Sequence, residues 1–237
     1  MSFNTWTPLA VSSEAFLWEG SIWRIVEAQH VASTMKVVDT NDEQTLLESL
    51  LDGNKPGYAF GTENLDYLLA TPFRYPTRAG GSRFRAPNDP GVFYAAESVV
   101  TAAAELGYWR WKFLKDSPDL DQIEPVAHTA FQASVKTKVI DLRQAPFVTD
   151  EAWLHKTNYT PTQALAGIAR HAGLGGIIYK SVRNPDPSWC AAILISTAFS
   201  ESKPAPAMQT WWLAVKKDEV IWRRDAQSIV FEANYWI

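Results

Sequence analysis

The sequence predicts an α+β fold in which short strands outnumber helices. Short apolar or alternating runs, which are typical of strands, recur along the 237 residues and dominate the second half. Segments with helical spacing and a capping signal are fewer and lie between those runs. Hydrophobic residues make up 46% and charged residues 20% of the chain, which fits a soluble globular protein with a sizeable core. The chain shows no repeat or linker, so we expect one domain over residues 1–237.

The first strand is expected at 21–27, where SIWRIVE alternates and is rich in bulky apolar residues. RFRA at 83–86 and VFYAA at 92–96 are predicted as two strands separated by the turn PNDPG. The segment 54–81, rich in proline and glycine, is expected to be irregular. Further strand candidates are VAHTAFQASV (126–135), TKVIDLR (137–143), GGIIYKS (175–181), CAAILIS (190–196), TWWLAV (210–215), VIWRR (220–224) and SIVFEA (228–233).

Three helices are predicted from their capping signals. A capping box from Thr40 to Glu43 opens a helix that ends near Gly53. Thr160, followed by a proline, caps another that ends at Gly173. Ser98 opens the helix between these two, and Glu105 falls at the edge of its apolar stripe, where a carboxylate can line a cleft. That stripe consists of Val99, Ala102, Ala103, Leu106, Trp109 and Phe113.

The composition and the motifs present argue against several functional classes. The net charge of −4 argues weakly against bulk binding to a nucleic-acid backbone. The single cysteine, Cys190, and the absence of a bilayer-spanning apolar run or a signal peptide lead us to expect a cytoplasmic protein without membrane contact. The four histidines show no metal-ligand spacing, so no metal site is expected. Neither a phosphate-binding glycine loop nor a serine-hydrolase elbow occurs.

Five residues together suggest a site for an anionic ligand. Arg83, Tyr94 and Glu105 follow one another at intervals of eleven residues, Arg24 stands in the first strand, and Ser181 ends an apolar run. Each alone has an ordinary structural explanation, such as a solvated basic strand or a buried tyrosine. If the five converge, the arginines can hold phosphate oxygens, and the carboxylate can stabilise an oxocarbenium-like transition state. That combination suits cleavage of a dinucleotide such as NAD.

These residues lie in a series of motifs that resembles the RES-domain proteins. The series consists of WRIVEAQH (23–30), LLATPFRYP (68–76), GSRFR (81–85), GVFYAAES (91–98), AAAELGYWR (102–110) and GIIYKSVRNP (176–185). The resemblance covers most of residues 20–200. Matched position by position, it implies Arg83, Glu105 and Ser181 as catalytic residues. It also implies that Arg24, Arg83, Tyr94 and Ser181 bind NAD.

The resemblance implies a mixed split β-core with flanking helices, similar to that of ADP-ribosyltransferase toxins. It implies the toxin of a type II toxin–antitoxin pair that cleaves the nicotinamide–ribose bond of NAD+, as a phosphorylase or glycohydrolase or as a protein mono-ADP-ribosyltransferase. NAD+ is then a substrate and not a recycled cofactor, and inorganic phosphate is a possible co-substrate. The expected partner is a helix-turn-helix antitoxin, through which alone the toxin would meet nucleic acid. The acceptor, which is phosphate, water or a protein side chain, stays open.

The sequence departs from the family pattern at two positions. Ile25 follows Arg24 where many members carry an aromatic residue, so the pair Arg74-Tyr75 is an alternative source of the first arginine. Phe84-Arg85 replaces the Trp-Asn pair found after the second arginine in many members. Glu97 is a second carboxylate near Glu105, which we prefer on spacing.

An RNA-binding module or ribonuclease is the alternative from another functional class. It would use a basic cluster interleaved with aromatic rings, which can bind single-stranded RNA by charge and stacking. The cluster consists of Arg74, Arg78, Arg83 and Arg85 with Phe73, Tyr75 and Phe84.

Overall fold

The protein is described by a computed structural model that covers residues 6–28, 59–75 and 80–237, with isolated positions at 40, 42, 43, 46, 47, 50 and 57. It has the predicted α+β fold, built on an eight-stranded mixed sheet in the order β1-β2-β5-β4-β3-β6-β7-β8. The strands are β1 (Phe16–Glu27), β2 (Phe93–Ala96), β3 (Ile123–Asp141), β4 (Gly176–Lys180), β5 (Trp189–Ile193), β6 (Gln209–Val215), β7 (Glu219–Arg224) and β8 (Gln227–Glu232). The α-helices are α1 (Pro8–Ser13), α3 (Tyr67–Arg74), α4 (Val99–Lys115) and α5 (Thr160–His171). Short 3₁₀ helices are η2 (Glu151–Leu154), η3 (Ser196–Ala198) and η4 (Ala233–Trp236).

The sheet splits between β1 and β2. Strand β1 pairs with β3 along its whole length, but it meets β2 only at Trp23, which lies opposite Ala96. Strands β2, β5, β4 and β3 continue the pairing back to β1, and β3–β4 is the parallel pair in this circuit. Side chains from both strands therefore have room where β1 and β2 diverge.

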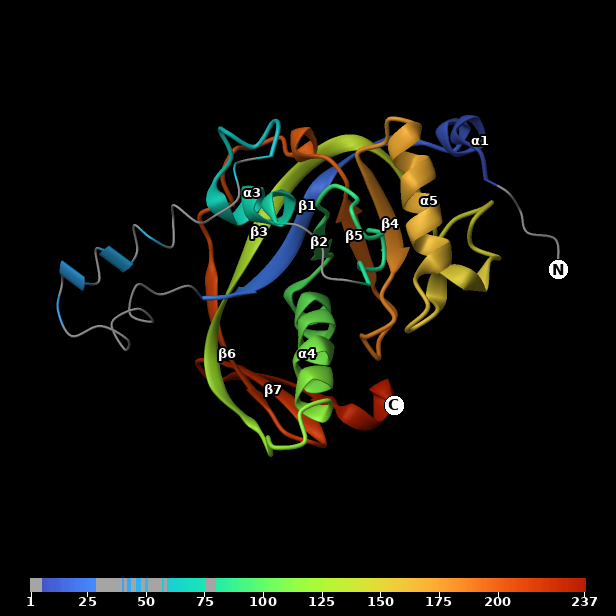
Figure 1. Cartoon of the computed structure of the whole chain (residues 1–237). Coiled ribbons are helices and arrows are strands. Elements are labelled where there is room, and N and C mark those ends of the chain that lie inside the picture. The colour runs from blue at the N-terminus through green and yellow to red at the C-terminus, as the bar shows by residue number, and fades with distance from the viewer. Residues whose placement is uncertain are drawn as a thin grey trace.

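The two faces of the sheet carry separate hydrophobic clusters. Residues of β2 alternate between them, as the period of two in a strand requires. Phe93 and Ala95 pack in a cluster with Leu68 and Leu69 of α3. Ala96 and the ring of Tyr94 pack on the opposite side, in the larger cluster formed with α4, α5 and β6–β8. Helix α3 thus covers one face, and α4 and α5 cover the other (Figure 1).

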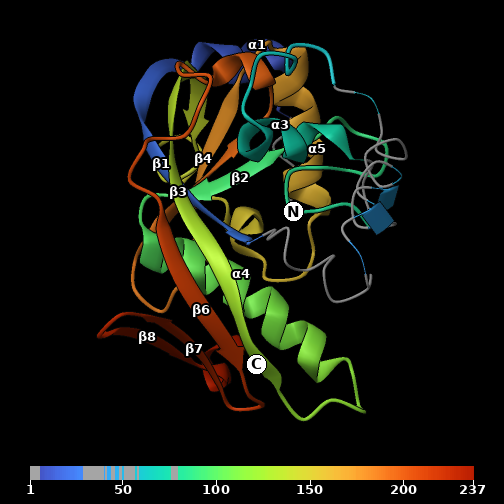
Figure 2. The ribbon, with the colours of Figure 1, turned by 90° about the vertical axis from the view of Figure 1, so that its left-hand side faces the viewer.

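Helix α4 is built for close approach to the sheet. Its first turn is capped by Ser98, whose hydroxyl accepts a hydrogen bond from the Thr101 amide at 3.1 Å. At Gly107, an added Cβ would lie 3.0 Å from a methyl carbon of Val220 and 3.4 Å from the Trp222 indole nitrogen. Glycine therefore lets α4 lie directly against β7. Figure 2 shows α4 running alongside β6–β8, with the chain ending near them.

The predicted strands at 126–135 and 137–143 are one strand, β3, so the expected break between them is wrong. Lys136 lies between the two predicted segments and pairs with Glu19 of β1 without interrupting the ladder. Nothing there forces a turn, because no glycine or proline stands between the two runs. The long strand pairs with β1 and β6 over successive parts of its length.

Two predictions between residues 54 and 86 are also wrong. The segment expected to be irregular contains α3, which begins where Asp66 accepts a hydrogen bond from the Leu68 amide at 2.9 Å and which tolerates Pro72 near its end. RFRA at 83–86 is not a strand. Residues 82–85 form a tight turn in which the Ser82 amide donates to the Arg85 carbonyl at 2.7 Å.

The other helices differ from the predictions in detail. The buried face of α4 includes Tyr108, Trp111 and Leu114, whereas Trp109 and Phe113 are 48% and 54% exposed. The buried stripe differs from the predicted one because β6–β8 pack against α4 and bury these side chains. The sequence pattern of α4 alone carries no information on that contact. Helix α5 includes Thr160 as its first residue and has no side-chain cap.

The helix predicted from Thr40 to Gly53 lies largely outside the described residues. Within that segment, the described positions 42, 43, 46, 47 and 50 are helical. Among the described residues, no helix has the length and apolar character needed to cross a bilayer.

Candidate active site

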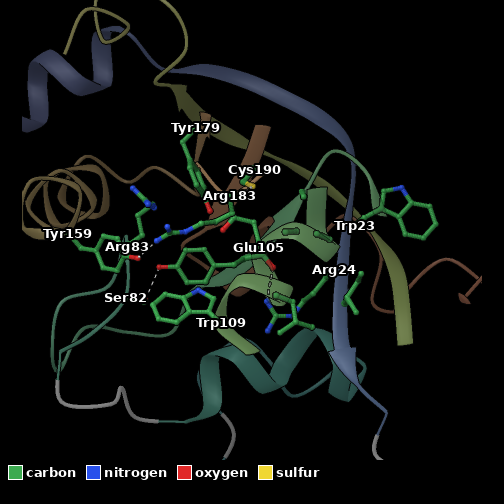
Figure 3. Close-up of a pocket in the computed structure, with 16 residues that line it drawn as sticks. Trp23, Arg24, Ser82, Arg83, Glu105, Trp109, Tyr159, Tyr179, Arg183 and Cys190 are labelled. Atoms are coloured by element: carbon green, nitrogen blue, oxygen red, sulfur yellow. Dashed lines mark hydrogen bonds between the residues drawn. The ribbon is translucent and has the colours of Figure 1, made fainter. Parts of the chain in front are cut away.

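A cavity of about 270 Å³ opens where β1, β2 and α4 meet. Four of the five predicted site residues line it: Arg24, Arg83, Tyr94 and Glu105. Arg83 and Tyr159 lie on one side of Glu105, and Arg24 and Trp23 lie on the other (Figure 3). The cavity therefore brings one carboxylate together with several cations and aromatic rings. Within the described part of the chain, no three histidine, cysteine or acidic side chains gather as metal ligands would.

Helix α4 presents Glu105 at the margin of the core, as its sequence pattern predicts. Ala102, Ala103 and Ala104 before it are buried, and Glu105 itself is half-buried. Its Oε1 accepts a hydrogen bond from the Ser181 hydroxyl at 2.6 Å and lies 3.7 Å from the Cys190 sulfur. The carboxylate is thus held in one orientation at the cavity wall.

Ser181 lies behind Glu105 and does not line the cavity. Its side chain is buried, and its oxygen accepts hydrogen bonds from the amides of Arg183 at 3.3 Å and Asn184 at 3.2 Å. With two amides donating to it, the hydroxyl has its proton free for Glu105. The geometry supports a role for Ser181 in orienting the carboxylate, and its direct contact with ribose stays a prediction.

Arg83 is buried in the 82–85 turn. Its Nη1 donates to the carbonyls of Trp153 and His155, both at 3.1 Å, and its guanidinium lies 4.8 Å from the centre of the Tyr159 ring. Its hydrogen-bond partners are backbone oxygens and not carboxylates. The positive charge of Arg83 therefore remains available to an anionic ligand in the cavity.

Tyr94 contributes its ring to the cavity and uses its hydroxyl to hold the 82–85 turn. The phenol oxygen accepts a hydrogen bond from the Phe84 amide at 2.9 Å and shares one with the Ser82 hydroxyl at 2.8 Å. Burial raises the pKa of Tyr94, so the phenol stays neutral. This one side chain fixes the turn that carries Arg83.

Arg24 occupies the split between β1 and β2. Its Nη1 donates to the Tyr94 carbonyl at 2.6 Å, its guanidinium lies 4.9 Å from the centre of the Phe93 ring, and its Nε is buried without a partner. Burial lowers the pKa of Arg24 from 12.5 to about 10, and no carboxylate among the described residues pairs with it. It remains a cation at neutral pH with no counter-ion in the described part of the chain.

Sequence reasoning missed several residues of this cavity. Arg183 is the most notable, because it is buried and its guanidinium carbon lies 3.4 Å from the centre of the Tyr108 ring. Its place two residues after Ser181 in the quoted SVRNP motif was the one available signal. The other missed residues include Trp109, Tyr159, Tyr179 and Cys190.

The comparison with protein families shows the family to which the chain belongs. The RES domain matches residues 59–216. The chain belongs to the RES-domain family. No similar sequence is found among curated proteins. Among solved structures, a chain of the M. tuberculosis MbcT–MbcA toxin–antitoxin complex is similar, with 12% identity, 97% of this chain and 94% of that chain covered, and a TM-score of 0.49.

The matched RES domain contains Arg83, Tyr94, Glu105 and Ser181, whereas Arg24 precedes it. Of the two candidates for the first arginine, Arg24 lines the cavity and Arg74, at the end of α3, does not. Glu97 also lies outside the cavity wall, and its Oε1 accepts a hydrogen bond from the Trp189 amide at 2.9 Å. The geometry thus favours Glu105 over Glu97 as the site carboxylate.

The described members of the basic cluster differ in their burial and contacts. Arg83 is buried, and Arg85 donates to the carbonyls of Asp89 at 3.0 Å and Tyr75 at 2.9 Å. Arg78 lies outside the described residues. Among its described residues, the burial of Arg83 and the backbone contacts of Arg85 do not favour the RNA-binding alternative.

The chain beyond the matched RES domain supports the turn that follows β4. The Trp236 indole N–H donates to the Arg183 carbonyl at 2.8 Å, and the Tyr235 hydroxyl donates to the Asn184 carbonyl at 3.1 Å. The amides of Arg183 and Asn184 are the same ones that hold Ser181. The C-terminal helix η4 is therefore linked to Glu105 through one turn and one serine.

Proposed function

We propose that this RES-domain protein cleaves the nicotinamide–ribose bond of NAD+ and acts as the toxin of a type II toxin–antitoxin pair. The observation that carries the proposal is the setting of Glu105. It is a carboxylate fixed by Ser181 in a cavity where the other charged side chains of the described residues, Arg24, Arg83 and Arg183, are cations. A dinucleotide brings both the phosphate anions that suit the arginines and the reacting carbon that suits the carboxylate.

In the proposed reaction, the bond between the ribose C1′ and the nicotinamide nitrogen breaks. Its electron pair goes to the pyridinium ring, which leaves as neutral nicotinamide, and positive charge develops at C1′. Glu105 stabilises that charge electrostatically, and Ser181 keeps the carboxylate oriented for it. An acceptor oxygen then bonds to this C1′ carbon, which becomes C1″ of the ADP-ribose product, and the proton of the acceptor passes to solvent.

The other cavity residues bind the substrate in this proposal. Arg24 and Arg83 hold the pyrophosphate oxygens, and Tyr94 packs its ring against the nicotinamide ribose. Binding an anion beside Arg24 supplies a counter-ion that none of the described residues provides.

The proposed acceptor is water or inorganic phosphate, and a protein side chain is the alternative at the same site. Water yields ADP-ribose, phosphate yields its 1″-phosphate, and a side chain yields a modified protein. The proposed partner is a helix-turn-helix antitoxin that blocks the cavity, and the proposed location is the cytoplasm.

The test is expression of the wild type and of Glu105→Gln at equal level in a bacterial host, with the cellular NAD pool and growth as readouts. The wild type is expected to deplete NAD and stop growth. Glu105→Gln keeps the shape and the Ser181 contact but removes the charge, so both effects should be lost. Glu97→Gln is the matched control and should remain toxic. Full toxicity of Glu105→Gln would contradict the assignment.

A further inference from the structure

A second cavity, of about 340 Å³, adjoins the first through Arg24. It lies beside α3, where Tyr67 and Thr71 line it, and extends to Val26 and Glu27 of β1. Arg24 lines both cavities. Because β1 and β2 diverge here, a single side chain can border the spaces on either side of the split.

The first cavity alone is small for a dinucleotide, and the second is only slightly larger. Ligand pockets for drug-sized molecules usually enclose about 300–1,000 Å³, and the first cavity, at about 270 Å³, falls below that range. The nicotinamide riboside half of NAD+ would fill it. The second cavity offers comparable space on the far side of the cation that suits the pyrophosphate.

The chemistry of the second cavity suits a nucleotide. Tyr67 and Tyr75 line it and are 57% and 41% exposed, so their rings are available for stacking with a base. Arg85 adds a second cation to the lining, and Glu27, whose Oε2 is paired with Arg110, keeps its Oε1 as an acceptor for a ribose hydroxyl. Aromatic rings, cations and one carboxylate thus occur together within reach of the shared arginine.

We propose that the second cavity is the subsite for the adenylate half of NAD+, with Arg24 at the pyrophosphate between the two halves. This inference rests on the proposed function. It makes Tyr67 and Tyr75 determinants of substrate specificity that do not touch the reacting atoms. Binding energy from this remote half then lowers the barrier at C1′, as remote substrate groups do in other enzymes.

The test compares NAD+ with nicotinamide mononucleotide, which keeps the reacting bond and one phosphate but lacks the adenylate half. The readout is kcat/KM for nicotinamide release by the full chain. The wild type is expected to prefer NAD+ by at least about tenfold, the scale of a single base stacked on an aromatic ring. The double variant Tyr67→Ala/Tyr75→Ala should lose about that factor with NAD+ and keep its kcat/KM for the mononucleotide. The Tyr67→Phe/Tyr75→Phe variant keeps the rings and should behave as the wild type.

Trp212→Ala is the control, because Trp212 is a similarly exposed aromatic residue on β6 that lines neither cavity. It should change neither substrate's kcat/KM. In the wild type, AMP should compete with NAD+, and the Ala double variant should be less sensitive to it. Equal kcat/KM for both substrates, or a double variant that loses both equally, overturns the subsite and leaves the proposed cleavage intact. Release from neither substrate overturns the proposed function itself.

Discussion

At the scale of single residues, the site depends on what surrounds the Glu105 carboxylate. Ser181 donates to it, and the only cysteine of the chain, Cys190, lies against the same oxygen. Burial, and then the negative charge of Glu105, raise the pKa of the Cys190 thiol well above its usual value. Because Cys190 lines the cavity, its reactivity reports on both the carboxylate and the ligand.

Replacing Glu105 by glutamine should make Cys190 more reactive. Without the neighbouring charge the pKa of the thiol falls, and each unit gives about ten times more of the reactive thiolate below that pKa. The measurement is the rate of alkylation at pH 8, followed by mass spectrometry. NAD+ bound to the Gln variant should slow the reaction. An alkylation rate that neither the substitution nor NAD+ changes would place Cys190 away from the site.

Some of the cavity residues could be predicted from the sequence, and others could not. Arg83, Tyr94 and Glu105 were predicted from residue type and spacing, and the cavity does contain them. Arg183 and Cys190 were missed because the contacts that place them at the site join residues more than seventy positions apart in sequence. Arg183 contacts Tyr108, and Cys190 contacts Glu105. Periodicity within one segment carries no information on such contacts. Ser181 was predicted as a site residue, but only the folded structure shows that it donates to the Glu105 carboxylate and does not line the cavity.

At the scale of elements, the split between β1 and β2 creates a position for Arg24 that disfavours its charge. Its lowered pKa, about 10 against 12.5, means that the folded protein holds the proton less tightly than the unfolded chain. The charged form therefore lowers stability at neutral pH, and that cost disappears as the pH rises through about 10 towards 12.5. A ligand anion would offset the same cost.

Arg24→Leu should separate stability from function. The free energy of unfolding should fall by less than about 1 kcal/mol or should rise. The reason is that an apolar side chain replaces a buried cation that has no carboxylate partner among the described residues. The kcat/KM for NAD+ should fall at least about tenfold through the lost phosphate contact. Denaturant unfolding and nicotinamide release measure the two effects. Arg24→Lys, which keeps the charge, should retain part of the activity; a Leu variant that unfolds easily yet turns over normally would contradict this role.

Prediction of the elements succeeded where the pattern was local. The strands of the second half follow from their apolar runs, and α4 follows from Ser98 and the residues after it. The turn at 82–85 was mistaken for a strand because part of what holds it is distant in sequence: the Phe84 amide donates to the Tyr94 hydroxyl. Helix α3 was missed because Pro72 argues against a helix when its tertiary packing is unknown.

At the scale of the whole molecule, the C-terminal segment beyond the matched RES domain reaches back to the site. Trp236 and Tyr235 donate to the carbonyls of Arg183 and Asn184, whose amides hold Ser181. The end of the chain is thus coupled to the orientation of Glu105 through hydrogen bonds on both sides of one turn. Helix α4, packed between the site and β6–β8, provides the rigid support.

Trp236→Phe should lower kcat several-fold with little change in KM. It keeps an aromatic ring in the cluster, smaller than the indole, and removes the N–H that donates to the Arg183 carbonyl. Trp111→Phe is the matched control, since Trp111 lies in the same cluster and donates to the Lys217 carbonyl at 3.0 Å, away from the site. Each should cost at least about 1 kcal/mol of unfolding free energy, because a buried indole loses volume as well as its hydrogen bond. Equal effects of the two variants on kcat would show that the C-terminal contact is structural only.

The most direct test of the central claim is nicotinamide release from NAD+ by purified, freshly folded protein free of any partner. Mass spectrometry would follow the products in buffer, with phosphate and with a cell lysate. We predict that the wild type releases nicotinamide together with ADP-ribose, its 1″-phosphate or a modified protein, and that Glu105→Gln releases none. Intact NAD+ under all three conditions, or equal release by the variant, would contradict the assignment of this cavity to cleavage of the nicotinamide–ribose bond.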